Sequence, residues 1–173
     1  MSAKGIRDID VIRTFVLQGT LNFTRYFFKI RQKRKFVIGK HHREIAAALD
    51  KVLCGEITRL IINIAPRYGK TELAVKNFIA EGLAINPKAK FIHLSYSDDL
   101  ARDNSRGVQD IINEPEYRRI FPATIPTSTN TKKWYTTEGG GLYAVSSAGQ
   151  VTGFGAGLVD EEENDELAKE VEE

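Results

Sequence analysis

The sequence predicts an α/β fold in which a mostly parallel sheet is covered by helices on both faces. Residues 59–85 and 90–112 each combine a short apolar strand with a following helix. Successive parallel strands need a crossover that returns across the sheet, and a helix of this length supplies it. We divide the chain into a helical, basic N-terminal segment (1–57), an α/β core (58–159) and an acidic, exposed tail (160–173).

The composition is that of a globular domain without a membrane span. The 173 residues can bury a sizeable core, and their apolar runs are far shorter than a bilayer requires. Residues 1–15 mix charges of both signs and lack the apolar centre of a secretory signal. The sequence has one cysteine, Cys54, which excludes an internal disulfide. We therefore expect a cytosolic protein.

The formal net charge of +2 conceals a gradient along the chain. Residues 1–59 hold 13 Lys and Arg against 5 Asp and Glu, a net charge of +8. Residues 60–159 hold 11 against 9, or +2, and residues 160–173 hold 1 against 9, or −8. The basic N-terminal third indicates a polyanionic partner, and the alternative is a solvated helix surface.

The stretch RLIINIAPRYGKT (59–71) has the pattern of a buried strand, a tight turn and a helix start. Its three isoleucines are β-branched and predict a strand covered on both faces. From Thr71 onward, apolar residues recur at helical spacing: Leu73, Ala74, Phe78, Ile79, Leu83 and Ile85. Because the N–H groups at a helix start favour anions, we interpret Pro66 to Thr71 as a phosphate-binding loop.

Each residue of the Gly-Lys-Thr triplet has a chemical role in that interpretation. Gly69 lets the backbone approach a phosphate, Lys70 reaches the β- and γ-phosphates, and the Thr71 hydroxyl ligates Mg²⁺. The common form of the motif has a glycine where this chain has Ile64. The alternative is an ordinary strand-to-helix turn with a surface lysine.

The N-terminal segment is expected to be helical over residues 8–30, with a break near Gly19-Thr20 and Thr20 as a candidate N-cap. A further helix is expected over residues 42–55. In the first of these regions, four aromatic residues lie among basic ones: Phe23, Tyr26, Phe27 and Phe28 among Arg25, Lys29 and Arg31. Such a mixture can stack on bases and bind phosphates, but we favour a helix that packs its aromatic side chains inward.

The connection QKRKFVIGKHHR (32–43) lies upstream of the loop and is strongly basic. Many nucleotide-binding loops are preceded by an aromatic and a polar side chain that hold the adenine. Gln32, Phe36, His41 and His42 suit that role. The adjacent histidines also suggest a metal site, but no cysteine or nearby carboxylate cluster completes one.

Downstream, Lys90–Ser95 predicts a second buried strand, and Trp134-Tyr135 with Leu142–Val145 predicts a hairpin around glycines 139–141. Between them, Asp98 and Asp99 begin a helix where negative charge is favourable. We interpret them as caps, with metal ligation as the alternative. A short helix or turn is expected over residues 115–122, and glycine-rich residues 149–157 predict a loop that approaches a ligand or a neighbouring subunit.

Five stretches follow one another in a distinctive order: FVIGKHHR, RLIINIAPRYGKTELA, FIHLSYSDDLARDNSR, EPEYRRIFP and KKWYTTEGGGLYAVSSAGQVTGFGAG. Together they resemble the N-terminal ATPase domain of the large terminase subunit of tailed bacteriophages and prophages, over roughly residues 20–157. In that family the phosphate-binding loop commonly has Pro and Arg before Gly-Lys-Ser/Thr, as Pro66-Arg67 stand here.

The resemblance implies a P-loop ATPase of the ASCE type that uses ATP and Mg²⁺. Such an enzyme forms a homo-oligomeric ring at the portal protein of an empty capsid and drives double-stranded DNA inward. The resemblance also implies the small terminase subunit as a partner, the cytoplasm of the bacterial host as the location, and no membrane contact.

Carried over to this sequence, the resemblance makes Lys70 and Arg67 the catalytic residues. Lys70 corresponds to the phosphate-binding lysine, and Arg67 to a basic residue that contacts the γ-phosphate and offsets charge in the transition state. The implied nucleotide-binding residues are Pro66, Arg67, Tyr68, Gly69, Lys70, Thr71 and Gln32, and Thr71 is the implied metal ligand. Arg102 and Arg106 are candidates for an arginine that acts across a subunit boundary.

The chain departs from the family toward its C-terminal end. Hydrolysis needs a Walker B element, in which a buried apolar strand carries an aspartate for Mg²⁺ and an acidic residue for the attacking water. Asp160 and Glu161 follow only two apolar residues after a glycine-rich run, and glycine weakens strands. We expect the Walker B strand to lie beyond Glu173, with Asp160 and Glu161 as the alternative, and the family's nuclease domain to be absent from these residues.

Two other functions compete with a packaging ATPase. One is a helicase-like DNA-dependent ATPase, which shares the strand-loop-helix core and the basic N-terminal region. The other is a non-catalytic remnant that binds nucleotide or DNA.

Overall fold

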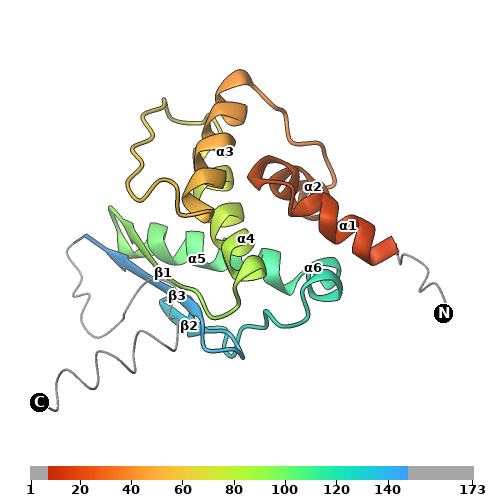
Figure 1. Cartoon of the computed structure of the whole chain (residues 1–173). Helices are drawn as coiled ribbons and strands as arrows, with labels where there is room; N and C mark the ends of the chain where they lie inside the picture. Colours follow the sequence, from red (N-terminus) through yellow and green to blue (C-terminus); the bar gives the residue numbers. More distant parts are fainter. Residues whose placement is uncertain (1–7, 148–173) are drawn as a thin grey trace, which may run out of the picture.

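The computed structural model describes residues 8–147, which form an α/β fold (Figure 1). Its helices are α1 (Asp8–Val16), α2 (Thr20–Gln32), α3 (Lys40–Leu53), α4 (Phe78–Ile85), α5 (Asp98–Asn113) and α6 (Pro115–Ile120). A π-helical segment, η1 (Glu72–Asn77), leads directly into α4. The strands are β1 (Lys90–Ser95), β2 (Lys133–Tyr135) and β3 (Gly141–Ser146). Helix α5 packs against β1 and β3, and the continuous rod of η1 and α4 packs against α2 and α5.

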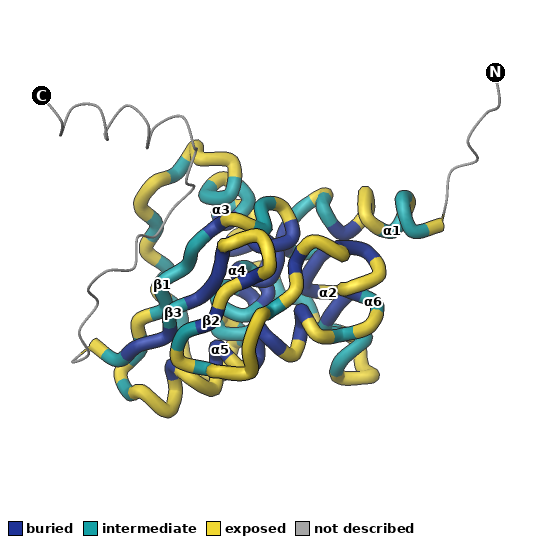
Figure 2. The backbone as a smooth tube through the Cα atoms, turned by 90° about the horizontal axis from the view of Figure 1, so that it is seen from below, coloured by how far each residue is buried: buried dark blue, intermediate teal, exposed yellow. Residues whose placement is uncertain are grey.

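The sheet has three strands in the order β1-β3-β2. β1 and β3 are parallel, with Phe91 opposite Leu142, and β2 and β3 are antiparallel, with Trp134 opposite Leu142. The strand predicted at 90–95 and the predicted hairpin are therefore confirmed as elements. The expectation that residues 90–95 are buried is wrong, since none of them is buried and Leu94 is 59% exposed. A Cβ on Gly140 would lie 2.2 Å from the Pro87 carbonyl oxygen, so the hairpin has no room for a side chain there. Figure 2 shows the central strand β3 buried and β1 only half-buried.

The sheet is smaller than predicted, and it is mixed rather than mostly parallel. Among residues 8–147 it does not include the run at 59–64 that we expected to be a strand buried on both faces. Ile61 is 94% exposed, whereas Leu60, Ile62 and Ile64 pack against a small core cluster on α3 and η1. The expectation is wrong for this run because its side chains alternate between core and solvent, and no neighbouring described backbone supplies a ladder of hydrogen bonds. The structure thus supports a small α/β fold, and the larger sheet of a P-loop NTPase is not seen in residues 8–147.

The predicted break between the first two helices is confirmed, with a different residue at the cap. Gly19 is the N-cap of α2, and Thr20 is its first helical residue. The Thr20 N–H donates to Asp50 Oδ1 of α3 at 2.7 Å. A carboxylate from another helix therefore satisfies the start of α2, where negative charge is favourable.

Two of the four aromatic side chains of α2 pack inward, as we favoured from the sequence, whereas Tyr26 and Phe28 are half-buried and line cavities. Phe23 and Phe27 are fully buried, and the Phe27 ring lies 5.3 Å from the ring of Tyr117 in α6. Arg25 and Lys29 face solvent on the same helix. These two phenylalanines are therefore part of the core that α1 and α2 share with α4, α5, α6 and β3, and they are not free to stack on bases.

Two further sequence expectations fall outside the described residues. The glycine-rich loop at 149–157 and the acidic tail at 160–173 lie beyond residue 147. Within residues 8–147, no helix combines the length and the apolar character that crossing a bilayer takes.

One carboxyl group, that of Glu81 in α4, lies inside the core. The residue is 1% exposed. Burial, reinforced by the nearby negative charge of Asp50, raises the pKa of Glu81 from 4.5 to about 8. Glu81 is therefore mostly protonated in the folded protein at neutral pH, while in the unfolded chain it is ionised.

This difference predicts a loss of stability on the alkaline side. Between the unfolded pKa of 4.5 and the folded pKa of about 8, the folded state binds more protons than the unfolded state. The free energy of unfolding should fall through this window by at most about 1.4 kcal/mol per pH unit. In urea unfolding from pH 5 to 9, Glu81→Gln should not show this fall in the free energy of unfolding. Glu138→Gln, at an exposed site, should show it as the wild type does. Parallel profiles for wild type and Glu81→Gln would contradict the assignment.

Candidate functional site

The candidate phosphate loop, residues 66–71, turns through two left-handed backbone positions. Arg67 has a φ of 67° and Gly69 a φ of 73°. Helical backbone begins at Lys70, and the first hydrogen bond of this turn runs from Leu73 N–H to the Gly69 carbonyl at 3.0 Å. The N–H groups that precede Leu73 in this turn therefore have no intrahelical acceptor, as at any helix start. Together with the helix dipole they offer donors to an anion.

Gly69 is required by its neighbours as well as by its backbone conformation. A Cβ on Gly69 would lie 2.9 Å from His42 Nε2 and 3.6 Å from Phe36 Cζ. A left-handed φ is costly for residues with a side chain. The loop therefore approaches α3 closely, and only glycine permits this approach without strain.

His42 connects the loop to the first turn of α3. Its Nδ1 accepts the Gly39 N–H at 2.9 Å, and its Nε2 lies 2.9 Å from the Tyr68 carbonyl oxygen. His41 Nε2 lies 3.1 Å from the same His42 Nε2. His42 is only 7% exposed, and burial lowers its pKa.

A cavity of about 560 Å³ opens beside the loop. Its walls come from the loop, from the connection before α3, from α3 itself and from α2, and they include Phe28, Arg34, Lys35, Phe36, His41, His42, Arg67, Tyr68, Gly69 and Glu72. The ring centroids of Phe36 and His42 lie 4.9 Å apart, and those of His41 and Tyr68 lie 5.4 Å apart. The cavity thus combines aromatic walls with three cationic side chains, which suits a planar, negatively charged ligand.

Of the predicted nucleotide-binding residues, Arg67, Tyr68 and Gly69 line this cavity, whereas Pro66, Lys70 and Thr71 stand on the same loop without lining it. Lys70 is exposed, and its Nζ lies 3.5 Å from the Ile64 carbonyl oxygen, at the limit of a hydrogen bond, so the ammonium group stays available. Pro66, Arg67 and Tyr68 are exposed on the loop, and Thr71 is half-buried directly behind Lys70.

Gln32 is placed differently from the other adenine candidates. It lines a second cavity, of about 540 Å³, together with Lys76 and Asp110, and not the cavity that Phe36 and the two histidines share. Glu72 lines both cavities and so lies between them.

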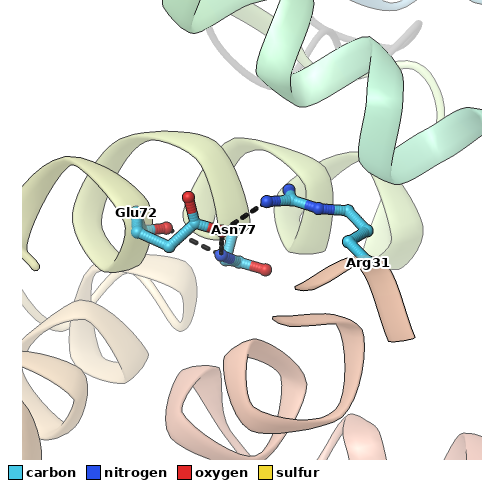
Figure 3. Close-up of polar contacts among 3 residues, drawn as sticks. All are labelled: Arg31, Glu72 and Asn77. Atoms are coloured by element: carbon cyan, nitrogen blue, oxygen red, sulfur yellow. Dashed lines mark hydrogen bonds and ion pairs between the residues drawn. The ribbon is translucent and has the colours of Figure 1, made fainter. Parts of the chain in front are cut away.

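A polar network behind the loop was missed by the sequence reasoning (Figure 3). Arg31 Nη2 of α2 lies 2.7 Å from Glu72 Oε1, and the side chains are 9% and 18% exposed. Asn77 Nδ2 donates to the Glu72 carbonyl at 2.7 Å and to Glu72 Oε1 at 3.0 Å. The network fixes the helix immediately after Thr71. The only sign of this network in the sequence was the carboxylate of Glu72, directly after the Gly-Lys-Thr triplet. Nothing in the sequence pointed to Arg31 as the partner of Glu72.

Ser97 and Asp98, at the start of α5, each accept a hydrogen bond from a backbone N–H group. Ser97 Oγ accepts the Leu100 N–H at 3.3 Å, and Asp98 Oδ1 accepts the Ser146 N–H at the end of β3 at 2.8 Å. The hydrogen bonds with Ser146 lower the pKa of Asp98. Residues 8–147 contain no group of three or more His, Cys, Asp and Glu side chains suited to a metal ion. The expectation that Asp98 and Asp99 cap this helix is therefore wrong: Ser97 is the N-cap, and Asp98 instead holds the end of β3.

Arg102 and Arg106 are exposed on α5, where a neighbouring molecule can reach them. Asp160 and Glu161, the alternative Walker B residues, lie outside the described residues.

A second groove extends the basic surface away from the loop. Its cavity, of about 300 Å³, shares Lys35, Phe36 and Ile38 with the wall of the loop cavity and is completed by Phe15, Arg25, Tyr26 and Lys29. Arg25 and Lys29 are exposed, and Tyr26 donates to Glu116 Oε1 at 2.8 Å. The loop cavity and this 300 Å³ cavity therefore form one basic tract along α2 and the connection that follows it.

Comparison of the chain with protein-family models, with curated proteins and with solved structures gave no match.

The Arg31–Glu72 pair predicts a large effect on stability when one partner is removed. Glu72→Leu should lower the free energy of unfolding by about 3–5 kcal/mol, because it leaves the buried guanidinium without its carboxylate. The double variant Arg31→Met with Glu72→Leu should recover much of the loss, since both charges are gone. Urea unfolding measures both effects.

The exposed pair of Lys40 and Glu44, 3.8 Å apart, provides the control. Glu44→Leu should change the free energy of unfolding by less than about 1 kcal/mol. If Glu44→Leu and Glu72→Leu lowered the free energy of unfolding equally, burial would not strengthen the contribution of the Arg31–Glu72 pair to stability.

Proposed function

We propose that residues 66–71 bind the phosphates of ATP with Mg²⁺, and that the chain is the ATPase part of a viral DNA-packaging terminase. In that role it couples ATP hydrolysis to the translocation of double-stranded DNA into a procapsid. The observation that carries the proposal is the loop itself. Two left-handed positions, Arg67 and Gly69, turn the backbone into the free N–H groups of a helix start, beside a cavity of about 560 Å³.

The charges around the loop fit a polyphosphate. Lys70 and Arg67 are exposed on the loop, and Arg34 and Lys35 contribute to the wall of the adjoining cavity. The one carboxylate in that wall, Glu72, is already bonded to Arg31. The site is therefore cationic overall. In the proposal Lys70 neutralises the β- and γ-phosphates, and Arg67 offsets charge on the γ-phosphate.

Mg²⁺ would be held by the Thr71 hydroxyl and by phosphate oxygens. Thr71 is half-buried at the first helical turn, the position from which a hydroxyl supports such an ion. Bound there, Mg²⁺ supplies neutralisation of phosphate charge. Glu72, the one carboxylate in the cavity wall, is bonded to Arg31, so no described residue beside the loop is assigned the role of positioning the attacking water. Nucleotide binding is therefore the part of the function that the described residues support directly.

The base of the nucleotide is assigned to the aromatic part of the same cavity. Phe36, His41 and Tyr68 contribute rings to its wall, and rings of this kind stack on bases of any sequence. The adenine preference rests on the family resemblance.

The basic tract along α2 supports a nucleic-acid partner. Arg25, Lys29 and Lys35 gather on one groove that adjoins the nucleotide cavity, and cationic side chains of this kind neutralise DNA phosphates. The tract alone would also fit a non-catalytic DNA-binding protein. The portal protein, the small terminase subunit, a homo-oligomeric ring and the bacterial cytoplasm enter the proposal through the family resemblance.

The central prediction concerns Lys70. Lys70→Ala should weaken binding of Mg²⁺ and a non-hydrolysable ATP analogue by about 10- to 100-fold, the effect of losing one charged hydrogen-bonding partner. Isothermal titration calorimetry measures the change. Lys76→Ala is the matched control, because Lys76 lies on the same helical rod but lines the other cavity. Equal affinities of wild type and Lys70→Ala would contradict the proposed phosphate site.

A second prediction concerns DNA. Affinity for duplex DNA should fall steeply as salt rises, and Lys29→Ala should reduce the slope of log affinity against log salt by about 0.9. Fluorescence anisotropy with a labelled duplex measures this slope, and Lys88→Ala, on the turn after α4, is the comparison. A flat salt response would remove DNA from the proposal. Strand separation in an unwinding assay would favour a helicase-like ATPase instead.

A further inference from the structure

A single imidazole holds the phosphate loop against the start of α3. We propose that neutral His42 is the positioning residue that locks the 66–71 loop for phosphate binding, and that a proton on His42 releases the lock and weakens nucleotide binding. The inference rests on the proposed function and names a control on that same site.

The hydrogen-bond geometry fixes which ring nitrogen carries the proton. The Gly39 N–H points at His42 Nδ1 at 2.9 Å, and a backbone N–H can only donate, so Nδ1 must accept. The neutral ring then carries its hydrogen on Nε2. That hydrogen points to the Tyr68 carbonyl oxygen, 2.9 Å away. One neutral side chain therefore caps α3 and holds the loop at the same time.

Holding the Tyr68 carbonyl also orients the next peptide group. In a trans peptide the C=O and the following N–H point in opposite directions. With the Tyr68 carbonyl turned toward His42, the Gly69 N–H is turned away from it. The left-handed φ of 73° at Gly69 then leads directly into the helix that starts at Lys70. The contact thus sets the backbone that the proposed phosphates would meet.

A second proton on His42 is incompatible with this arrangement. Both ring nitrogens would then be donors, and Nδ1–H would face the Gly39 N–H. The cap of α3 would be lost, and the ring would have to turn. Turning the ring removes the hydrogen bond to Tyr68 and also moves the ring next to Gly69, where an added Cβ would lie 2.9 Å from Nε2.

The surroundings of His42 favour the neutral form. His42 shares the wall of the loop cavity with Arg34 and Lys35 of the connection, His41 of α3, Arg67 and Tyr68 of the loop, and Glu72 of η1. Three of these are cations, and Glu72 is bonded to Arg31. Burial lowers the pKa of His42; the hydrogen bond to the Tyr68 carbonyl raises it in part, and the nearby His41 acts with burial to lower it. Histidine is the residue type whose ordinary pKa lies between pH 5 and 8, so the lock should open on mild acidification.

The nucleotide-free protein gives the first test, by NMR titration of the three imidazoles between pH 5 and 8. His42 should show the Nε2–H tautomer and a midpoint below 6.5. The amide signals of Gly39, Gly69 and Lys70 should shift with that same midpoint. A His42 midpoint at or above 6.5, or loop signals that follow His41 instead, would overturn the proposal. This test needs no variant and no nucleotide.

Nucleotide binding gives the second test, by calorimetry with Mg²⁺ and a non-hydrolysable ATP analogue. Wild-type affinity should fall about fivefold between pH 7.5 and 5.5, the effect of losing about one net hydrogen bond. A terminal phosphate also titrates near pH 6. The profile of His42→Gln, which has no titrating ring at this position, supplies the correction.

Two substitutions separate the two halves of the lock. His42→Asn places an oxygen where Nδ1 accepts the Gly39 N–H, but it does not reach Tyr68. His42→Gln places an amide donor near the Tyr68 carbonyl. At pH 7.5, His42→Asn should bind about fivefold more weakly than wild type, and His42→Gln should recover part of that loss. Both should lack the His42 component of the pH profile.

His93→Asn is the matched control, because His93 on β1 is a half-buried histidine whose pKa burial also lowers; it is bonded to Asn104 Nδ2 at 3.0 Å and does not line the loop cavity. It should keep the wild-type pH profile. Equal pH profiles for wild type and His42→Gln would overturn the proposal. If no nucleotide binds at any pH, the proposed function fails, and the NMR midpoints still decide whether His42 locks the loop.

Discussion

The close contact between Gly69 and the His42 ring is the constraint on which the site depends. It requires a glycine in a left-handed conformation, a buried histidine in one tautomer, and an α3 whose first turn begins at Lys40. The loop therefore belongs to the packing of α3 as much as to its own sequence. A Gly-Lys-Thr triplet without this support would be a mobile turn with a surface lysine.

Behind the loop, the Arg31–Glu72–Asn77 network connects the same helix start to α2. Asn77 donates to the backbone and the side chain of Glu72, across the π-helical segment η1. Such segments are rare and occur often at functional sites. His42 on one side and Arg31 on the other thus hold the first turn after the loop in place. Rigid support of this kind is what a phosphate site needs, since its donors must be aligned before the ligand arrives.

The sequence predicted the local elements well, because each depends on nearby residues. The break at Gly19, the strand at 90–95 and the glycine hairpin at 139–141 follow from turn residues and alternation. The strand at 59–64 failed for a non-local reason: β-branched residues favour an extended chain, but a strand also needs a neighbouring backbone. In the structure Ile61 faces solvent, while Ile62 and Ile64 pack on α3 and η1.

The site was also predictable only where it depends on residues close together in the sequence. Lys70, Gly69 and Thr71 form a motif that is visible in the sequence, and Phe36, His41 and His42 were candidates through their position upstream. Gln32 was a candidate for the same reason, but in the structure it lines the other cavity, with Lys76 and Asp110. Arg31 lies 41 positions before Glu72, so no local pattern could join them. Contacts of this range depend on how helices cross, which composition and periodicity do not specify.

The proposed function requires that the amides of the 66–71 loop bind a nucleoside triphosphate. NMR shift mapping of the full chain with Mg²⁺ and a non-hydrolysable ATP analogue tests it directly. The account predicts the largest changes at the amides of Gly69, Lys70 and Thr71, with smaller changes at Phe36 and the two adjacent histidines. Saturating analogue that leaves these signals unmoved, or that shifts only signals on other elements, would contradict it.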